Sequence, residues 1–470
     1  MAAQSSLPTA VRNAVRRLRP ILGDRLVTTS DPGYESTRRL WNAAVTTRPA
    51  LIARCLDTDD VRAVVRTARD CGVPLSVRAG GHDWAGRALR PGGLVLDMTG
   101  MNQVSIARDS ATAIVAGGAT AADLLAAAQP YGLVTATGVV RAVGMAGLSL
   151  AGGYGPLCGR YGLALDNLLG AELVLADGTQ VTASLDDDAN LYWALRGGGG
   201  NFGVVTSLRY RLHPLRTVLA GMILFPVEQA RNVLASYRNF LPDCPDELTV
   251  MAGFLPGPQR QPMVFLAPTW SGRDLGAGER AVARLAAFGR PITAQVGPMT
   301  YGDALGMFDG GMLPGNHYLL RTRWLAELSG PAVEVLLDAA TSASSPFSAL
   351  AVHHFHGAAS RIGRTETAFG LRDDHLLVEV IAVWPPGEPV AAHRHWADRC
   401  SARLAPLALP GGYPNLLAPD EHERVRLAYG PNYPRVLAAK RRYDPDNLFG
   451  SAVPTLPRIT GPRARTRSIG

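Results

Sequence analysis

The sequence predicts an α+β protein of two domains, on three observations. Its 470 residues exceed what one ordinary hydrophobic core holds, so two domains of roughly 200 residues each are expected. Residues 1–215 alternate short strands and helices separated by glycines. Residues 216–410 instead carry longer apolar runs interleaved with helices, which indicates a second domain made of an antiparallel sheet covered by helices. Residues 411–470 return to the first style and are expected to rejoin the first domain, with a mobile tail from about residue 457.

In the first domain the apolar spacing predicts a helix that begins near Thr58 and ends at Gly72. Thr58 is expected to cap the helix with its hydroxyl, and Gly72 to end it, because glycine takes a left-handed conformation at low cost. The other expected elements are strands over residues 48–55, 73–77, 93–97 and 113–116 and a helix over residues 120–129.

In the second domain six apolar runs predict strands. They cover residues 218–225, 248–254, 263–267, 318–324, 349–355 and 376–383. Helices are expected between them over residues 227–240, 280–288 and 331–343.

Composition excludes several classes of protein. The net charge of +8 comes from the two ends, since residues 1–20 and 457–470 each carry four arginines and no acid. The body is therefore near neutral and has no basic stripe, so a nucleic-acid partner is not expected. No run of about 18 apolar residues and no signal peptide is visible, so we expect no membrane association and a cytoplasmic location. Five scattered cysteines without a C-x-x-C pair argue against a disulfide framework and structural zinc.

The most informative stretch is Arg78-Ala-Gly-Gly-His-Asp-Trp-Ala-Gly86, directly after a predicted strand. Two adjacent glycines let successive backbone N–H groups converge on an anion, the geometry that holds a pyrophosphate. His82 follows the pair and is placed to touch whatever the pyrophosphate carries.

Two further glycine clusters follow. One runs from Gly144 to Gly155 and leads into Asp166-Asn167, and the other is Arg196-Gly-Gly-Gly-Gly-Asn-Phe-Gly-Val-Val-Thr206. Such glycine density indicates backbone that passes close to a ligand or to other backbone. A Rossmann dinucleotide site is excluded, because no cluster opens a long helix with an acidic residue about 20 positions later.

The order of these motifs, with Tyr413-x-Asn415 and Tyr443-Asp-Pro-x-Asn447-Leu-Phe near the end, resembles the FAD-linked oxidases of the berberine-bridge-enzyme type. These belong to the vanillyl-alcohol-oxidase superfamily and have a PCMH-type FAD-binding fold. The resemblance covers essentially the whole chain and is strongest over residues 45–215 and 413–449. It implies that residues 1–215 and 411–470 form the FAD-binding domain and residues 216–410 the substrate domain.

The resemblance also implies which residues hold the cofactor. His82 would be linked covalently to the 8α-methyl group of the flavin through a ring nitrogen. The residues expected to contact FAD are Arg78, Ala79, Gly80, Gly81, His82, Asp83, Gly86, Val143, Gly144, Gly147, Gly152, Gly153, Gly155, Gly203, Val204, Val205, Asn415 and Asn447.

One departure from the family pattern concerns a second covalent link. Many members carry a cysteine bonded to flavin C6 just before a V-G-x-G-G stretch, whereas here the region reads Val139-Val-Arg-Ala-Val143-Gly. Cys158 lies beyond the glycine cluster and is interpreted as a packing residue. The expectation is one histidyl link and no cysteinyl link.

The catalytic base is expected to be Tyr413, which in this family lies over the flavin and deprotonates the substrate. A tyrosine of ordinary pKa, about 10, would need neighbouring arginines to acidify it, and a purely structural role is the alternative.

On a strand His354 and His356 share one face, which is expected to face the flavin, while His353 points away. His354 and His356 are thus candidate substrate contacts or proton carriers, as are Arg321, Arg323 and Trp324. No carboxylate completes a metal site with the histidines, so no metal is expected.

The resemblance implies an oxidase that removes a hydride from a small alcohol, hemiacetal or amine and passes the electrons to dioxygen, giving hydrogen peroxide. A secondary metabolite, sugar or alkaloid substrate fits this class. Alternatives are a dehydrogenase with another electron acceptor and an oxidative or non-redox cyclase on the same scaffold. A monomer or a homodimer is expected.

Overall fold

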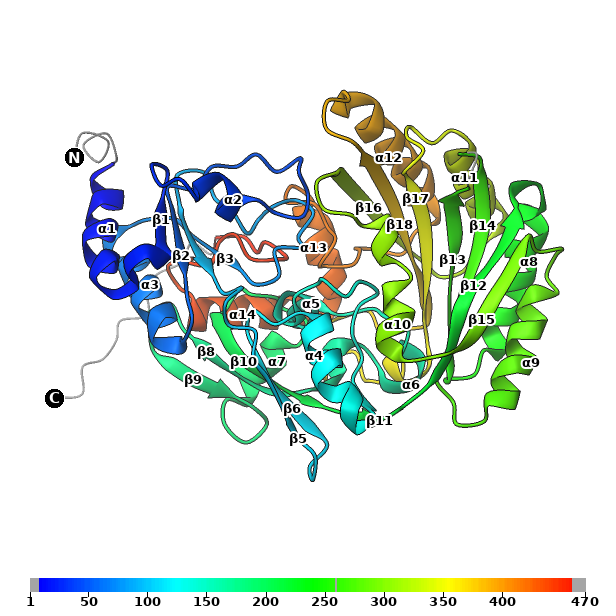
Figure 1. Ribbon diagram of the computed structural model, residues 1–470, viewed down its shortest axis with the longest axis horizontal. Coiled ribbons are helices and arrows are strands. Elements are labelled where there is room, and N and C mark those ends of the chain that lie inside the picture. Colours follow the sequence, from blue (N-terminus) through cyan, green and yellow to red (C-terminus); the bar gives the residue numbers. More distant parts are fainter. Residues whose placement is uncertain (1–7, 258–259, 459–470) are drawn as a thin grey trace.

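The computed structural model describes residues 8–257 and 260–458. Figure 1 shows two lobes side by side, the first built from both ends of the chain and the second from its middle. The architecture is α+β, with one sheet that contains parallel strands and larger sheets that are antiparallel. The chain passes from the first lobe to the second between β11 (His213–Pro214) and β12 (Val218–Pro226).

A four-stranded sheet of order β1-β2-β4-β3 opens the first lobe. Its strands are β1 (Leu26–Thr28), β2 (Leu51–Arg54), β3 (Leu75–Arg78) and β4 (Leu94–Asp97). The last three run parallel, so their carboxyl ends meet at one edge. Helices α1 (Thr9–Leu22) and α3 (Thr58–Cys71) pack on this sheet through one apolar cluster, and the short α2 (Tyr34–Arg38) follows β1.

A five-stranded antiparallel sheet of order β5-β6-β10-β8-β9 completes the first lobe. Its strands are β5 (Val104–Ala107), β6 (Thr112–Ala116), β8 (Leu168–Val174), β9 (Gln180–Ala183) and β10 (Val204–Arg211), and β7 (Leu133–Val134) pairs separately with β11. The helices packed against it are α4 (Ala121–Ala128), α5 (Met145–Ala151), α7 (Ala189–Leu195) and α14 (Tyr433–Tyr443). Because α14 comes from the C-terminal segment, residues 433–443 pack against the five-stranded sheet of the first lobe.

The second lobe is a seven-stranded antiparallel sheet of order β15-β12-β14-β13-β17-β18-β16. Besides β12, its strands are β13 (Leu248–Pro256), β14 (Pro262–Trp270), β15 (Thr293–Met299), β16 (His317–Leu325), β17 (Ala349–Phe355) and β18 (His375–Trp384). Four helices cover one face: α8 (Ala230–Phe240), α9 (Leu275–Ala286), α11 (Gly330–Thr341) and α12 (Val390–Leu404). The short helices α6 (Cys158–Tyr161), α10 (Tyr301–Gly306) and α13 (His422–Tyr429) lie between the lobes in Figure 1.

The alternation of side chains gives this sheet its two faces. On β17, Leu350 and Val352 pack into the core beneath the helices, whereas Ala351 belongs to a cluster on the opposite face. That opposite face is turned toward the first lobe. The register pairs Thr322 of β16 with Glu379 of β18, and these residues share this face.

All six predicted strands of the second lobe are present, and sequence reasoning missed β15 and α12. Gly72 ends α3 with a left-handed φ of 67°, as predicted. The predicted cap of that helix was wrong by one residue. Asp57, not Thr58, accepts the bond from the Asp60 backbone N–H, because a carboxylate at this position reaches the free donors of the first turn. The predicted tail lies outside the described residues apart from Pro457 and Arg458.

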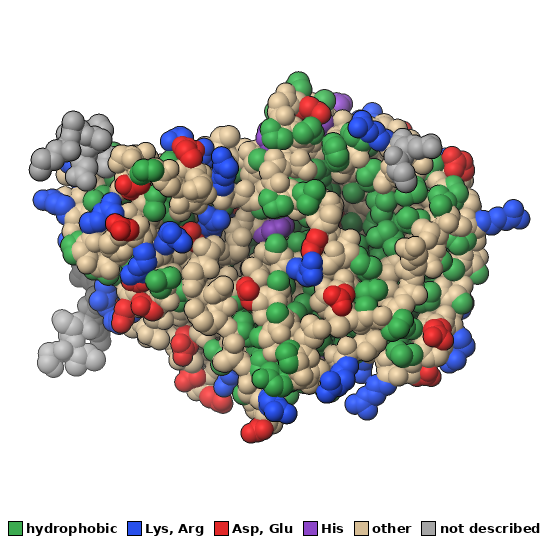
Figure 2. Space-filling view, viewed as in Figure 1, with side chains coloured by type: hydrophobic (Ala, Val, Ile, Leu, Met, Phe, Trp, Pro, Cys, Tyr) green, Lys and Arg blue, Asp and Glu red, His purple; other side chains and the backbone are tan. Residues whose placement is uncertain are grey.

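The surface carries mixed charge. Figure 2 shows acidic and basic side chains interspersed over the face in view rather than gathered in a basic stripe. Among the described helices none is both long and apolar enough to cross a bilayer.

Candidate functional site

Two glycine loops of the first lobe meet backbone to backbone. Gly80 follows β3, and Gly144 precedes α5. A Cβ added to Gly144 would lie 2.5 Å from the Gly80 backbone nitrogen, and a Cβ added to Gly80 would overlap the Gly144 nitrogen in turn. Only glycine permits this approach, and it leaves the backbone of both loops bare along the wall of one cavity.

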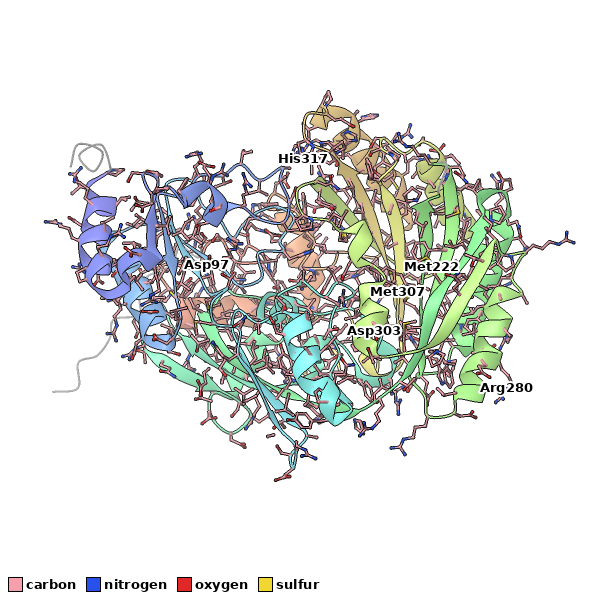
Figure 3. All side chains as sticks on the ribbon, in the orientation of Figure 1. Asp97, Met222, Arg280, Asp303, Met307 and His317 are labelled. Atoms are coloured by element: carbon pink, nitrogen blue, oxygen red, sulfur yellow. The ribbon has the colours of Figure 1, made fainter. Side chains whose placement is uncertain are left out.

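The first of these loops is braced from behind by Arg78. Its guanidinium donates to the Thr37 carbonyl at 2.7 Å and lies 3.8 Å from Asp97, which ends β4 and is labelled in Figure 3. Gly81 has a φ of 69°, and a Cβ there would sit 3.1 Å from the Arg78 Nε atom. Arg78 therefore fixes the turn from outside the cavity rather than lining it.

The cavity lies where the two glycine loops, the second-lobe sheet and the C-terminal segment meet, and has a volume of about 270 Å³. Its lining includes Ala79, Gly80, Gly81, His82, Asp83, Val143, Gly144, Gly147, Gly203, Val204 and Val205 from the first lobe, Leu320, His353 and Glu379 from the second, and Tyr413, Asn415 and Phe449 from the C-terminal segment. Twelve of the eighteen residues predicted to bind the cofactor are in this lining, including Asn415.

His82 lines the cavity as one layer of an aromatic stack. Its ring lies 4.2 Å from that of Trp41, and Trp41 lies 4.0 Å from Tyr318 of β16. Removal from water lowers the pKa of His82 to about 4, so the imidazole is neutral at physiological pH. A neutral imidazole, oriented by stacking on Trp41, is a competent nucleophile.

Tyr413 reaches the same cavity from the C-terminal segment. Its hydroxyl accepts hydrogen bonds from the Gly153 backbone N–H at 2.7 Å and from Asn415 Nδ2 at 3.0 Å. A Cβ on Gly152 would lie 2.5 Å from the Tyr413 ring, so the absence of a side chain there lets the ring dock. Both lone pairs of the hydroxyl are occupied, which leaves its proton free to donate.

The expected acidification of Tyr413 by arginines is wrong. Burial raises the pKa of Tyr413 to about 12, and no arginine contributes to this shift. The bonds from Asn415 and the backbone favour the phenolate but do not offset desolvation, so the hydroxyl is protonated at neutral pH.

Sequence reasoning missed Glu379 and His353, which lie side by side in the cavity wall. Glu379 Oε1 is 3.4 Å from His353 Nε2, and both side chains are largely buried. The other carboxylate of the described lining, that of Asp83, is held by Arg87 at 2.7 Å. Glu379 is the one charged residue in the apolar run Leu376–Trp384, and this exception is the sequence signal that could have identified it.

The predicted orientation of the histidine strand was wrong by one residue. His353 lines the cavity, whereas His354 and, just after β17, His356 do not; His353 and His354 both border a smaller pocket beside Cys158. A strand alternates every residue, so an error of one position exchanges its faces. On β16, Arg321 binds Asp398 and Arg323 binds Ser401, both on α12, so these two side chains also point away from the cavity, while Trp324 is buried in a cluster with Phe369.

Six predicted cofactor residues do not line the cavity: Arg78, Gly86, Gly152, Gly153, Gly155 and Asn447. The glycines serve close packing instead, since a Cβ on each would overlap a neighbouring group such as Val45 beside Gly86 or the Thr137 carbonyl beside Gly155. Asn447 takes a left-handed φ of 55° in the turn after α14. Cys158 is buried, and its thiol donates to the His354 carbonyl at 3.3 Å.

Comparisons with known proteins show which family the chain belongs to. Residues 49–184 match the model of an FAD binding domain, and residues 412–453 match the berberine and berberine-like family. (R)-6-hydroxynicotine oxidase of Paenarthrobacter nicotinovorans is 32% identical over 89% of this chain and 93% of its own length.

Solved structures show the same fold. The crystal structure of 6-hydroxy-D-nicotine oxidase from Arthrobacter nicotinovorans is 32% identical, has a TM-score of 0.82 and covers 91% of this chain and 96% of its own. Glucooligosaccharide oxidase from Acremonium strictum, which carries a 6-S-cysteinyl, 8α-N1-histidyl FAD, is 22% identical, with a TM-score of 0.84 and coverage of 96% and 100%. Because both family models match and the 32% identity to (R)-6-hydroxynicotine oxidase extends over nearly the whole length, the chain belongs to the berberine-bridge-enzyme-like FAD-linked oxidoreductases.

Proposed function

We propose that this enzyme is an FAD-dependent oxidase that removes a hydride from a small alcohol, hemiacetal or amine and transfers the electrons to dioxygen, releasing hydrogen peroxide. The observation that carries the proposal is one cavity that joins a bare glycine cradle and a neutral histidine to a buried carboxylate. Its 32% identical relative is an oxidase, which favours dioxygen as the acceptor.

The residues present fit an FAD. The Gly80–Gly144 contact leaves backbone that a diphosphate can approach, and the remaining lining is mostly apolar, as a flavin ring requires. Bound FAD supplies a hydride acceptor that dioxygen can reoxidise. His82 is proposed as its single covalent anchor, because no cysteine is found among residues 139–147.

The proposed proton chemistry centres on Glu379. A substrate hydroxyl or ammonium placed near Glu379 and His353 gives its proton to the carboxylate while the adjacent carbon gives up a hydride. Burial beside His353 keeps water away from this carboxylate and holds it in place. Tyr413 donates its free proton to a polar atom of the substrate and so orients it; its raised pKa makes it a poor base.

The test is to add candidate amines and alcohols under anaerobic conditions, follow the yellow absorbance, and then admit air. An oxidase loses the colour with substrate and regains it in air, with one peroxide formed per product. Bleaching without reoxidation by air would indicate the dehydrogenase alternative. Product formed without bleaching would indicate the non-redox cyclase.

A further inference from the structure

A second cluster of ligating side chains lies on the face of the second-lobe sheet away from the cavity. Cys244 follows the 3₁₀ turn Leu241–Asp243, just before β13, while His354 lies at the end of β17 and His356 directly after it. One sulfur or nitrogen atom of each residue lies within 4.8 Å of the others, in the only such group of three among the described residues. The chain separates Cys244 from the two histidines by 110 and 112 positions, so spacing along the sequence could not reveal the cluster.

The three ligating atoms are slightly farther apart than they would be around a bound metal ion. When three atoms are at most 4.8 Å apart, a point within about 2.8 Å of all three exists. Zinc bonds to sulfur at about 2.3 Å and to histidine nitrogen at about 2.0–2.1 Å, so the three ligating atoms would have to approach the ion by less than about 1 Å. The two imidazoles are stacked, with ring centres 4.1 Å apart and planes at 7°, so one ring must also turn about its Cβ–Cγ bond for both nitrogen lone pairs to point at one ion.

The histidines also have unmet bonding capacity. His354 Nδ1 and His356 Nε2 are buried without a hydrogen-bond partner, in side chains that are 5% and 3% exposed. Buried polar atoms are normally paired, and each exception calls for an explanation. The Gly159 backbone packs on His356, since a Cβ there would lie 2.6 Å from Nε2, so the ring is held in place.

Binding through sulfur requires the Cys244 thiol, whose pKa burial raises to about 12, to lose its proton. The Cys244 thiol is half-buried and donates to the Leu248 carbonyl at 3.2 Å. Its proton would leave to solvent as the sulfur–metal bond forms.

We propose that Cys244, His354 and His356 bind one zinc ion, with a fourth position left to water. A thiolate with two imidazoles suits zinc and copper and disfavours calcium and magnesium, which prefer oxygen ligands; zinc is the ion proposed here. The ion ties the loop before β13 to the end of β17. It lies apart from the proposed hydride transfer, because His353 and Glu379 occupy the opposite face.

The experiment uses the full flavin-bound chain, stripped with a chelator and given one equivalent of ZnCl₂ or CoCl₂. Zinc retained after gel filtration is counted by mass spectrometry, and a cobalt-minus-apo difference spectrum reports thiolate-to-metal charge transfer. Cys244→Ser is compared with Cys400→Ser, which removes a buried thiol of α12 outside the cluster. Independently of any variant, iodoacetamide labelling is followed on Cys244 with and without zinc, with half-buried Cys71 as the internal reference.

The proposal predicts one zinc per chain, a charge-transfer band lost in Cys244→Ser and kept in Cys400→Ser, and protection of Cys244 but not Cys71. Loss of the thiolate is expected to weaken zinc binding by more than about 100-fold, beyond the effect of outer-shell changes. Substoichiometric zinc, a band that survives in Cys244→Ser, or equal labelling of Cys244 with and without zinc would each overturn it.

Discussion

The proposed chemistry depends most on Glu379, because it is the carboxylate of the cavity wall that no arginine binds. Replacing Glu379 with glutamine keeps the shape but removes the proton acceptor, so we expect kcat to fall by about 10²–10⁴-fold with flavin content unchanged. Glu334→Gln, on the exposed surface of α11, is the control and is expected to keep full activity. Steady-state peroxide release measures both, and a Glu379→Gln enzyme of normal kcat would exclude Glu379 as the base.

Tyr413 is expected to behave differently from Glu379. Tyr413→Phe removes a donor to the substrate, so KM is expected to rise by about tenfold, the value of one hydrogen bond, while kcat changes less. Because the pKa of Tyr413 is raised to about 12, no activity limb between pH 6 and 9 is assigned to this hydroxyl. A limb in that range that disappears in Tyr413→Phe would instead show that Tyr413 is the base.

At the scale of elements, the meeting of the β3 loop with the loop before α5 forms the cradle. Gly80→Ala would push the two backbones apart and is expected to lower flavin content at least several-fold. Gly330→Ala is the matched control, because a Cβ there meets nothing within 4 Å. Flavin absorbance per chain is the measurement, and full flavin content in Gly80→Ala would show that the cradle tolerates separation.

Among these elements, the sequence predicts the strands and the glycine loops, but not which face of a strand meets the cavity. The strands of both lobes follow from apolar runs, and the glycine loops from backbone that must pass close to other backbone. Strand faces could not be predicted, because a shift of one residue exchanges His353 with His354, and both are buried. Nor could the sequence distinguish glycines that line the cavity, such as Gly144, from those that only permit packing, such as Gly155.

For the whole molecule, the buried histidines couple stability to pH. Burial lowers the pKa of His375 to about 4; its Nδ1 bonds the Asp373 carbonyl and its Nε2 the Tyr154 hydroxyl. Below pH 6.5 the unfolded chain binds a proton that the folded chain excludes. Stability is therefore fully present above pH 6.5 and declines as pH falls toward 4.

This histidine alone is expected to account for about 2 kcal/mol of the loss between pH 7 and pH 5. Chemical denaturation at both pH values measures the loss. His375→Gln is expected to show a smaller difference than the wild type, and a change at the exposed His422 is expected to leave it unaltered. An unchanged difference in His375→Gln would mean that His375 titrates alike in the folded and unfolded chains.

The most direct test of the central claim is the intact mass of the acid-precipitated protein, followed by peptide mapping. We expect a precipitate that stays yellow, a mass increased by one FAD, and the adduct on the peptide that contains His82, with none on the peptide that contains Cys158. Flavin released wholly into the supernatant would contradict the covalent link to His82, and a purified chain without any flavin would contradict the proposed oxidase.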